Sequence, residues 1–223
     1  MQTELATPLS RIQINAAIRL QDKLAGDAPS ARALDILSER LPAFDLESCL
    51  VKTATLNQLY YTNVRALTRM ARRVHDVMRQ NIKELAADEL VEQLAHLPKT
   101  EEHQRQWNHI SFASKFAHFF ISSETFPPYD SYADKMLIYH LGYAGAIFDR
   151  HHIYRAFTLN FNTLKAQLQF DCTTRELDKY LWLSGVYRQW RNNPENPKIN
   201  VDAQRLFINA SEETKRDLEI IMG

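Results

Sequence analysis

Lys115 and Asp130 stand close together in the stretch WNHISFASKFAHFFISSETFPPYDSY (107–132). Ser111 is a predicted N-cap, which places Lys115 in the first turn of a helix, near the positive end of its macrodipole. That position disfavours the ammonium and makes the neutral, nucleophilic amine easier to populate. Pro127-Pro128 cannot continue the helix, and Asp130 follows where an aspartate caps the next one. We therefore expect an amine and a carboxylate to converge on one cleft near 110–132.

Two kinds of chemistry fit such a pair. The amine could be a Schiff-base nucleophile or a positioned cation, while the carboxylate could deprotonate it or stabilise an oxocarbenium-like transition state. The alternative from residue types alone is a surface lysine and an ordinary helix cap. The eight histidines match no HExxH or EF-hand spacing, and no GxSxG, Rossmann or P-loop pattern occurs. We expect neither a metal nor another cofactor.

Four arginines form the clearest basic feature of the chain. They fall at i, i+4, i+7 and i+8 on a helix predicted to begin at Thr62 or Asn63: Arg65, Arg69, Arg72 and Arg73. One interpretation is a ridge that contacts DNA phosphates, and the other is a solvated helix face. The 27 basic and 27 acidic side chains cancel, so DNA binding would depend on this local patch rather than on net charge.

Apolar residues at helical spacing predict an all-α fold with ten or eleven helices. The expected helices cover 8–25, 30–41, 45–59, 62–78, 86–97, 131–141, 150–170, 175–190, 202–210 and 211–222, besides the one that begins at 111. No stretch approaches the roughly 18 apolar residues of a membrane span. Cys49 and Cys172 match no zinc spacing, so reduced thiols in a cytoplasm are the expectation.

Three blocks of the sequence resemble the helix-hairpin-helix (HhH-GPD) DNA glycosylase superfamily, especially its small 8-oxoguanine DNA glycosylase-like members. They are TLNQLYYTNV (55–64), ISFASKFAHFF with FPPYDS (110–131) and RELDKYLWLSG (175–185). In that superfamily a lysine begins the helix after the hairpin, and a loop with proline leads to an aspartate. By resemblance, Lys115 matches the catalytic lysine and Asp130 the aspartate.

The sequence departs from the superfamily at the hairpin, which is normally rich in glycine so that backbone N–H groups hold a DNA phosphate. Here it reads HISFAS, and the separation of Lys115 from Asp130 is short. Either the hairpin's contact with DNA has been lost, or the arginines from Arg65 to Arg73 have taken over the anchoring.

The resemblance implies one domain over 1–223, a compact two-lobed helical bundle that flips a damaged or modified base into a pocket between its lobes. Lys115 would attack the anomeric carbon of the sugar and leave a Schiff base that permits strand cleavage, with electrostatic help from Asp130. The expected base pocket consists of Phe112, Phe126, Tyr129 and Trp182 for stacking and Asp178 for a base edge. Asn57 and Asn63 would wedge into the duplex.

Each of these roles has an alternative. The aromatic side chains could be core residues, and the two asparagines could cap or kink a helix. The main hypothesis is therefore a DNA glycosylase of base-excision repair, with lyase activity left open. The alternative is a non-catalytic helical module that binds DNA or a protein partner, and small-molecule lyase chemistry at Lys115 is a third reading.

Overall fold

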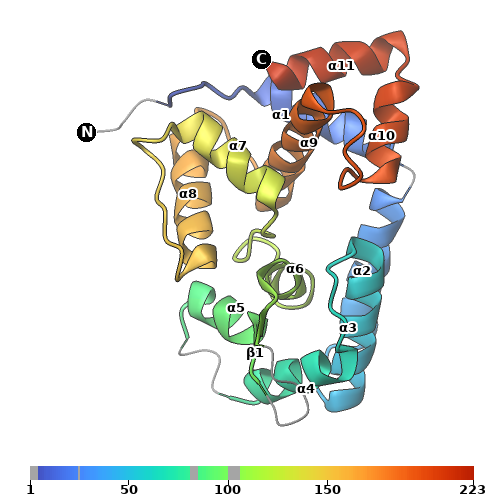
Figure 1. Ribbon diagram of the computed structural model, residues 1–223, viewed down its shortest axis with the longest axis vertical. Coiled ribbons are helices and arrows are strands. Elements are labelled where there is room, and N and C mark those ends of the chain that lie inside the picture. Colours follow the sequence, from blue (N-terminus) through green and yellow to red (C-terminus); the bar gives the residue numbers. More distant parts are fainter. Residues whose placement is uncertain (1–4, 25, 81–84, 100–105) are drawn as a thin grey trace. The chain divides into compact units, whose positions relative to one another are not determined.

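The computed structural model describes residues 5–24, 26–80, 85–99 and 106–223. Over these residues the chain is all-α, as predicted, with one short ribbon of two antiparallel strands (Figure 1). The helices are α1 (Arg11–Asp22), α2 (Asp27–Arg40), α3 (Leu46–Tyr60), α4 (Leu67–Met78), α5 (Ala87–Ala95), α6 (Ile110–Phe120), α7 (Ser131–Leu141), α8 (Ile153–Gln167), α9 (Thr174–Asn192), α10 (Val201–Ile208) and α11 (Glu212–Met222). The strands are β1 (His96–Leu97) and β2 (Trp107–Asn108).

The chain divides into two compact units. Unit 1 comprises Met1–Ser30, Asp130–Ile147 and Leu159–Gly223, and unit 2 comprises Ala31–Tyr129 and Phe148–Thr158. One boundary between the units falls between Tyr129 and Asp130, the residue that precedes α7. The single domain with a cleft near 110–132 stays a prediction. No helix among the described residues combines the length and the apolar character needed to cross a bilayer.

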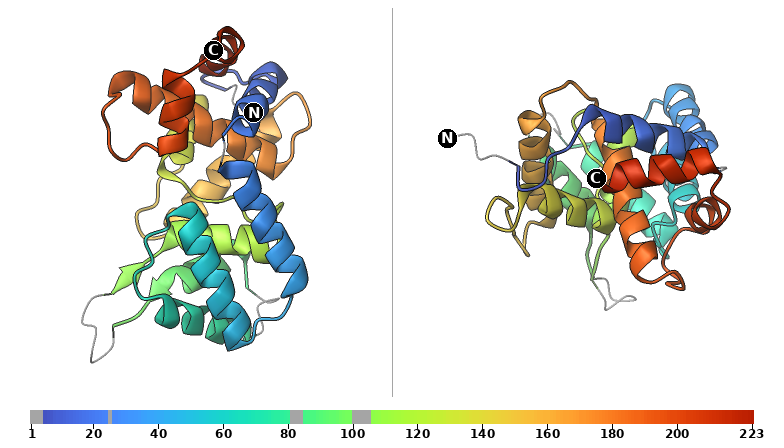
Figure 2. Two further views of the ribbon diagram at one scale, coloured as in Figure 1. Left: turned by 90° about the vertical axis from the view of Figure 1, so that its right-hand side faces the viewer. Right: turned by 90° about the horizontal axis from the view of Figure 1, so that it is seen from above.

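In unit 1, α9 packs against α1, α7, α10 and α11. Its start is fixed by a capping box in which the Thr173 side chain accepts from the Glu176 N–H and the Glu176 side chain accepts from the Thr173 N–H. Helices α1 and α11 run side by side (Figure 2), and the Arg19 guanidinium donates twice to the Asp217 carboxylate, at 3.2 and 2.5 Å. Asp217 is buried, so this bidentate pair joins the two helices.

A buried histidine ties α7 of unit 1 to the N-terminal segment. The Nδ1 of His140 lies 2.8 Å from the Thr7 carbonyl, and its Nε2 lies 3.0 Å from the Tyr180 hydroxyl. A carbonyl only accepts, so Nδ1 carries the proton and Nε2 accepts from tyrosine. Burial, the largest cause, lowers the pKa of His140, and the charge of Arg188 lowers it further, against the opposing bond to Thr7. The folded state therefore favours the neutral ring.

We expect His140 to make unit 1 less stable in acid. Because its folded pKa lies below its unfolded value, the stabilisation is complete above about pH 6.5 and is lost as the pH falls through the folded pKa. The melting temperature of the wild-type protein should fall between pH 7 and pH 5. The melting temperature of His140→Gln should fall less over the same range. His151→Gln, at an exposed position, should behave as wild type. Equal pH dependence in His140→Gln and wild type would contradict this account.

In unit 2, α6 packs between α3 and α5, and Figure 1 shows α6 almost end-on. Phe112, Phe116 and Phe120 follow one another at every fourth position along α6, with ring centroids 5.8 and 4.9 Å apart. All three are buried, so they form the core of this unit.

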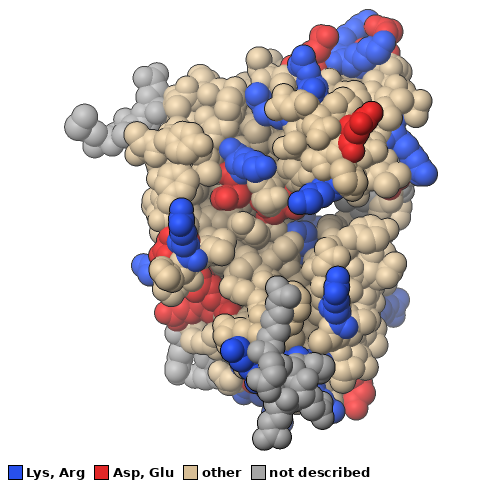
Figure 3. Space-filling view, viewed as in Figure 1, with Lys and Arg blue, Asp and Glu red and all other residues tan. Residues whose placement is uncertain are grey.

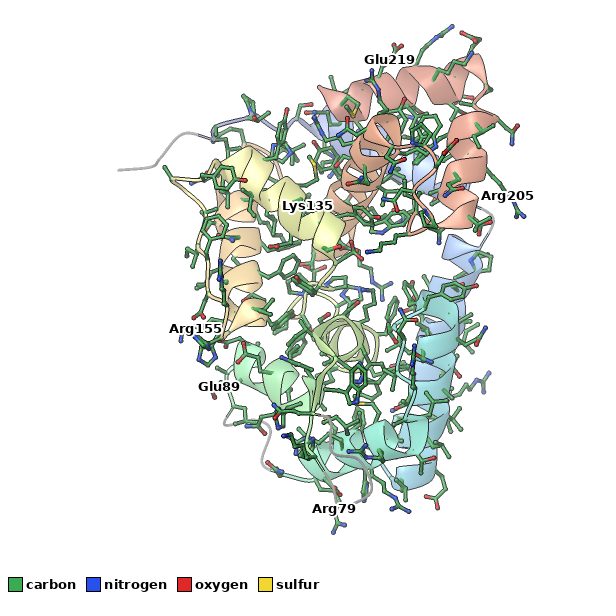
Figure 4. All side chains as sticks on the ribbon, in the orientation of Figure 1. Arg79, Glu89, Lys135, Arg155, Arg205 and Glu219 are labelled. Carbon is green, nitrogen blue, oxygen red and sulfur yellow. The ribbon has the colours of Figure 1, made fainter. Side chains whose placement is uncertain are left out.

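The surface of α5 is acidic, and Figure 3 shows its red side chains gathered there. Basic side chains at the start of α8, in the same unit, pair with acidic residues of α5. His152 Nδ1 lies 2.8 Å from the Glu92 carboxylate, and Arg155 Nε lies 3.7 Å from Asp88. Figure 4 shows Arg155 close to Glu89 of this acidic face. The pairs are largely exposed, and they contribute little to stability.

Candidate functional site

Helix α6 begins at Ile110, and its N-cap is His109, which makes no side-chain cap hydrogen bond. The prediction that Ser111 caps this helix is therefore wrong, and Lys115 lies in the second turn. The cause is non-local: β2 pairs with β1, and the His109 N–H donates to the Ala95 carbonyl at 2.9 Å, so the helix begins where the ribbon ends. The macrodipole acts mainly in the first turn, which weakens the argument that it activates Lys115.

Lys115 is buried, with 9% of its surface exposed. Its Nζ donates to the Ser111 hydroxyl, one turn earlier, and to the Tyr129 carbonyl, each at 2.9 Å. The surface-lysine alternative is thus excluded. The Lys115 amine is held against the segment at the end of the first stretch of unit 2.

That segment, Phe126–Tyr129, is called here the Pro-Pro loop, and its polar backbone groups are met by α6 and α8. The His118 ring lies 2.9 Å from the Phe126 carbonyl, and the Tyr154 hydroxyl donates to the Pro127 carbonyl at 3.0 Å. The Tyr129 N–H donates to the Ser114 hydroxyl at 2.9 Å. Because Phe126, Pro127 and Pro128 are buried, an unpaired carbonyl here would be costly. Lys115 therefore has a structural role, because it pairs with the Tyr129 carbonyl of this loop.

Asp130 is the N-cap of α7, as predicted, and its carboxylate accepts from the Tyr132 N–H at 2.8 Å. It belongs to unit 1, whereas Lys115 belongs to unit 2. Each of the two side chains is placed by its own helix terminus or turn. Their convergence on one cleft stays a prediction.

The predicted base-pocket residues fall into both units. Phe112 has no exposed surface and packs on Phe116, and Phe126 is 5% exposed, so both lie in the core of unit 2. Tyr129 is half-buried with its ring edge-on to Phe157, at a centroid distance of 5.2 Å. Asp178 and Trp182 lie one turn apart on α9 of unit 1, and both are half-buried.

The arginine stripe is less uniform than its spacing predicts. Helix α4 begins at Leu67 rather than near Thr62, so Arg65 lies before it. Arg69 Nη2 donates to the Pro98 carbonyl at 2.7 Å, and Arg73 Nε donates to the Gln93 carbonyl, in the last turn of α5, at 2.9 Å. A cation is favourable at such a helix C-terminus. Arg65 and Arg72 are exposed, so two of the four arginines are presented to solvent and two hold the adjoining backbone.

A cavity of about 770 Å³ lies beside the start of α4 in unit 2, and we call it the α4 pocket. Two of the predicted arginines line it together with an aromatic pair that the sequence did not indicate. The Trp107 and His109 rings are nearly parallel, at 15°, with centroids 6.0 Å apart. Burial lowers the pKa of His109. The described lining residues are Asn63, Arg65, Ala66, Leu67, Thr68, Arg69, Leu97, Trp107 and His109.

The two predicted wedge residues differ in their surroundings. The Asn57 side-chain oxygen accepts from the Thr62 hydroxyl at 2.9 Å and from the Val64 N–H at 2.8 Å, which ties the loop after α3 to that helix. Asn63 is exposed and has φ of 58°, and Tyr61 has φ of 48°. Left-handed backbone is unfavourable for tyrosine and tolerated by asparagine. Asn57 thus stabilises a strained loop at the rim of the α4 pocket.

Asn57→Ala should destabilise the protein by about 1–3 kcal/mol, because it leaves the Val64 N–H and the Thr62 hydroxyl without their acceptor. Asn57→Asp keeps an oxygen at that position and should retain most of the stability. Denaturant unfolding measures both variants. Equal losses for alanine and aspartate would show that the two hydrogen bonds do not hold the loop.

A second buried amine, Lys52 on α3, was not predicted from the sequence. Its side chain is 1% exposed, donates to the Ala43 carbonyl at 2.9 Å and lies 3.9 Å from the centroid of the Phe44 ring. Burial lowers the pKa of Lys52 and raises the pKa of the neighbouring Cys49 thiol to about 11. Because Lys52 is enclosed by these contacts, we interpret it as a packing residue. In the described part of the chain, no group of three or more metal-ligating side chains is assembled.

One family model, described as an N-terminal domain, matches residues 13–125 of the chain. The match runs from α1 to just beyond α6, which is just over half of the chain. It includes Lys115 and the α4 pocket, whereas Asp130 lies beyond it. No curated protein and no solved structure matches the chain. The resemblance to DNA glycosylases stays a prediction.

Proposed function

The chain belongs to the HI_0787_N family, and we propose that it is a DNA glycosylase that excises a damaged or modified base through Lys115. The observation that carries the proposal is the placement of this lysine. Its Nζ is buried, is oriented by Ser111 and Tyr129, and sits at the loop that leads directly into the Asp130 cap. A buried, oriented lysine followed along the chain by a proline-containing loop and a helix-capping aspartate is the order of features that the three resembling sequence blocks imply.

In the proposed reaction, Lys115 first loses a proton and its lone pair attacks the anomeric carbon of the nucleotide. The glycosidic C–N bond breaks, and its electron pair leaves with the base, which takes up a proton. Opening of the sugar ring gives an iminium between Nζ and the sugar, which permits cleavage of the strand. Asp130 would stabilise the positive charge that develops on the sugar.

The exposed arginines support anchoring of DNA near α4. Arg65 and Arg72 are both exposed, so their guanidinium groups are accessible to a ligand in solvent. Guanidinium groups bind phosphates through several N–H donors at once. This arrangement favours the alternative in which arginines replace the glycine-rich hairpin.

A second function is favoured by the other role of Lys115. Its Nζ donates to the Ser111 hydroxyl and to the Tyr129 carbonyl, and the second bond satisfies a carbonyl of the Pro-Pro loop. A lysine that served only this structural purpose would belong to a non-catalytic module that binds DNA or a protein partner.

The test is borohydride trapping on duplexes that carry 8-oxoguanine, uracil or an abasic site. We expect a covalent protein–DNA adduct with at least one duplex, and peptide mapping should place it on Lys115. The duplex that reacts would identify the class of base.

Two results would count against the glycosylase. DNA binding without adduct or base release on any duplex would assign the non-catalytic DNA-binding module. Absence of DNA binding altogether would assign a protein partner instead. In either case the α6 lysine would be a structural residue.

A cytoplasmic location is part of the same proposal. In the described part of the chain neither Cys49 nor Cys172 forms a disulfide, and reduced thiols persist in a reducing compartment. The proposed reaction uses no cofactor, and the partner that it requires is DNA carrying the modified base.

A further inference from the structure

The α4 pocket has the size of a small-molecule site. Its volume of about 770 Å³ lies within the range of roughly 300–1,000 Å³ that such sites occupy. Its described walls come from the loop after α3, the first turn of α4, strand β1 and strand β2 with the residue after it, all in unit 2. The pocket therefore brings together residues that are far apart in the sequence.

One wall of the α4 pocket is positive. Ala66 supplies no side-chain cap, so the N–H groups of the first turn of α4 lack a partner within the helix. The helix macrodipole adds positive charge at this end. Arg65 and Arg69 line the same cavity; Arg69 uses one nitrogen on the Pro98 carbonyl and keeps other donors of its guanidinium. None of the described lining residues is acidic, so this wall is suited to a phosphate.

A second part of the α4 pocket is aromatic, and it is formed by β2 and the residue after it. Trp107 and His109 are half-buried, their rings are nearly parallel, and both line the cavity. Burial lowers the pKa of His109, which favours the neutral imidazole, and the ring offers a flat face beside Trp107. Flat aromatic side chains in a positive groove are what unpaired bases stack on. Asn63, on the rim, carries an amide that can donate to and accept from a base edge.

We propose that the α4 pocket binds a single unpaired nucleotide, with its phosphate at the first turn of α4 beside Arg65 and Arg69 and its base against Trp107. The nucleotide is either free or part of a DNA strand. The site does not use Lys115 and goes beyond the proposed excision reaction; the one residue that it shares with the proposed DNA anchoring is Arg65.

Calorimetric titration of the full chain with deoxyadenosine 5′-monophosphate tests the site. One molecule should bind per chain, and deoxyadenosine or inorganic phosphate alone should bind at least about tenfold more weakly, because each meets only one wall. Arg65→Ala and Trp107→Ala should each weaken binding by about tenfold or more. Arg79→Ala should leave it unchanged, because this exposed arginine stands at the other end of α4 (Figure 4).

Thr68 offers a sharper pair of variants, because it is exposed, lines the pocket and lies in the first turn of α4. Thr68→Glu places a negative charge where a helix tolerates it well, so the fold should remain as stable while phosphate binding falls at least tenfold. Thr68→Gln has nearly the same shape without the charge and should bind close to wild type. Equal binding by the Glu and Gln variants would overturn the phosphate position.

A 5′-phosphorylated single-stranded oligonucleotide distinguishes the two sources of the nucleotide. Binding at least tenfold tighter than the monophosphate, with competition between them, would assign a strand; equal or weaker binding would assign a free nucleotide. No saturable binding of either probe at millimolar concentration would overturn the proposal. Adduct formation at Lys115 is measured separately, so the failure of one proposal is distinguishable from the failure of the other.

Discussion

Lys115→Ala is expected to abolish the borohydride-trapped adduct and to slow base release by at least about 10²-fold, as loss of a reacting group does. The same substitution removes a donor from the Tyr129 carbonyl and from the Ser111 hydroxyl. It should therefore also cost about 1–3 kcal/mol of stability. A loss of activity in this variant alone would not separate chemistry from folding.

Lys115→Arg makes that separation. Arginine can still donate to Tyr129 and Ser111, but its guanidinium stays protonated and is not a nucleophile. We expect the arginine variant to melt closer to wild type than the alanine variant and to form no adduct. Lys135→Ala is the matched control, because Lys135 is the next lysine along the chain and is exposed on α7 (Figure 4). An adduct of wild-type yield in Lys115→Arg would remove Lys115 from the reaction.

Gly185→Val should strongly destabilise unit 1, by about 3 kcal/mol or somewhat more. A Cβ at Gly185 would lie 2.7 Å from the Tyr132 carbonyl oxygen and 3.0 Å from two further atoms of Tyr132. The nearest of these atoms belongs to the backbone of α7, which cannot rotate away. The absence of a side chain at Gly185 is what permits α9 to approach the first turn of α7.

Thermal unfolding measures the effect. For a chain of this length, about 3 kcal/mol corresponds to roughly 6–12 °C. Gly185→Ala should fall between Val and wild type, since a better helix propensity offsets part of the clash. At Gly26 the corresponding Cβ would meet Asp202 Oδ2 at 2.9 Å, the movable end of a side chain, so Gly26→Ala should change little. A wild-type melting temperature for Gly185→Val would show that the α7–α9 approach is looser than described.

Local signals in the sequence predicted local structure well. Asp130 caps α7 as predicted, and Asp45 and Ser211, the first residues of two of the expected helix ranges, cap α3 and α11, because a cap depends on one side chain and the N–H groups two or three residues later. Helical periodicity was sufficient to predict the all-α class. The start of α6 was misplaced because it is set by pairing of β1 with β2, and two residues per strand leave no alternating pattern to detect.

The candidate site was harder to predict for the same reason. Residue types and spacing indicated Lys115. Its buried Nζ, however, is paired with the carbonyl of Tyr129, which lies 14 residues further on, at the end of the Pro-Pro loop. Arg69 and Arg73 read as a ridge, and their carbonyl partners lie 29 and 20 residues further on. Trp107 and Lys52 carried no sequence signal, because their roles arise from neighbours that only the fold brings together.

The Pro-Pro loop also makes its own movement easy to follow. Pro127 and Pro128 have no amide hydrogen, so deuterium exchange in the middle of this segment is reported by the Tyr129 amide, which is bonded to the Ser114 hydroxyl. Exchange at that one position requires the loop to open. Its rate therefore gives the free energy with which α6 holds the loop, and a change in that rate on adding DNA would record motion at Lys115 without any label.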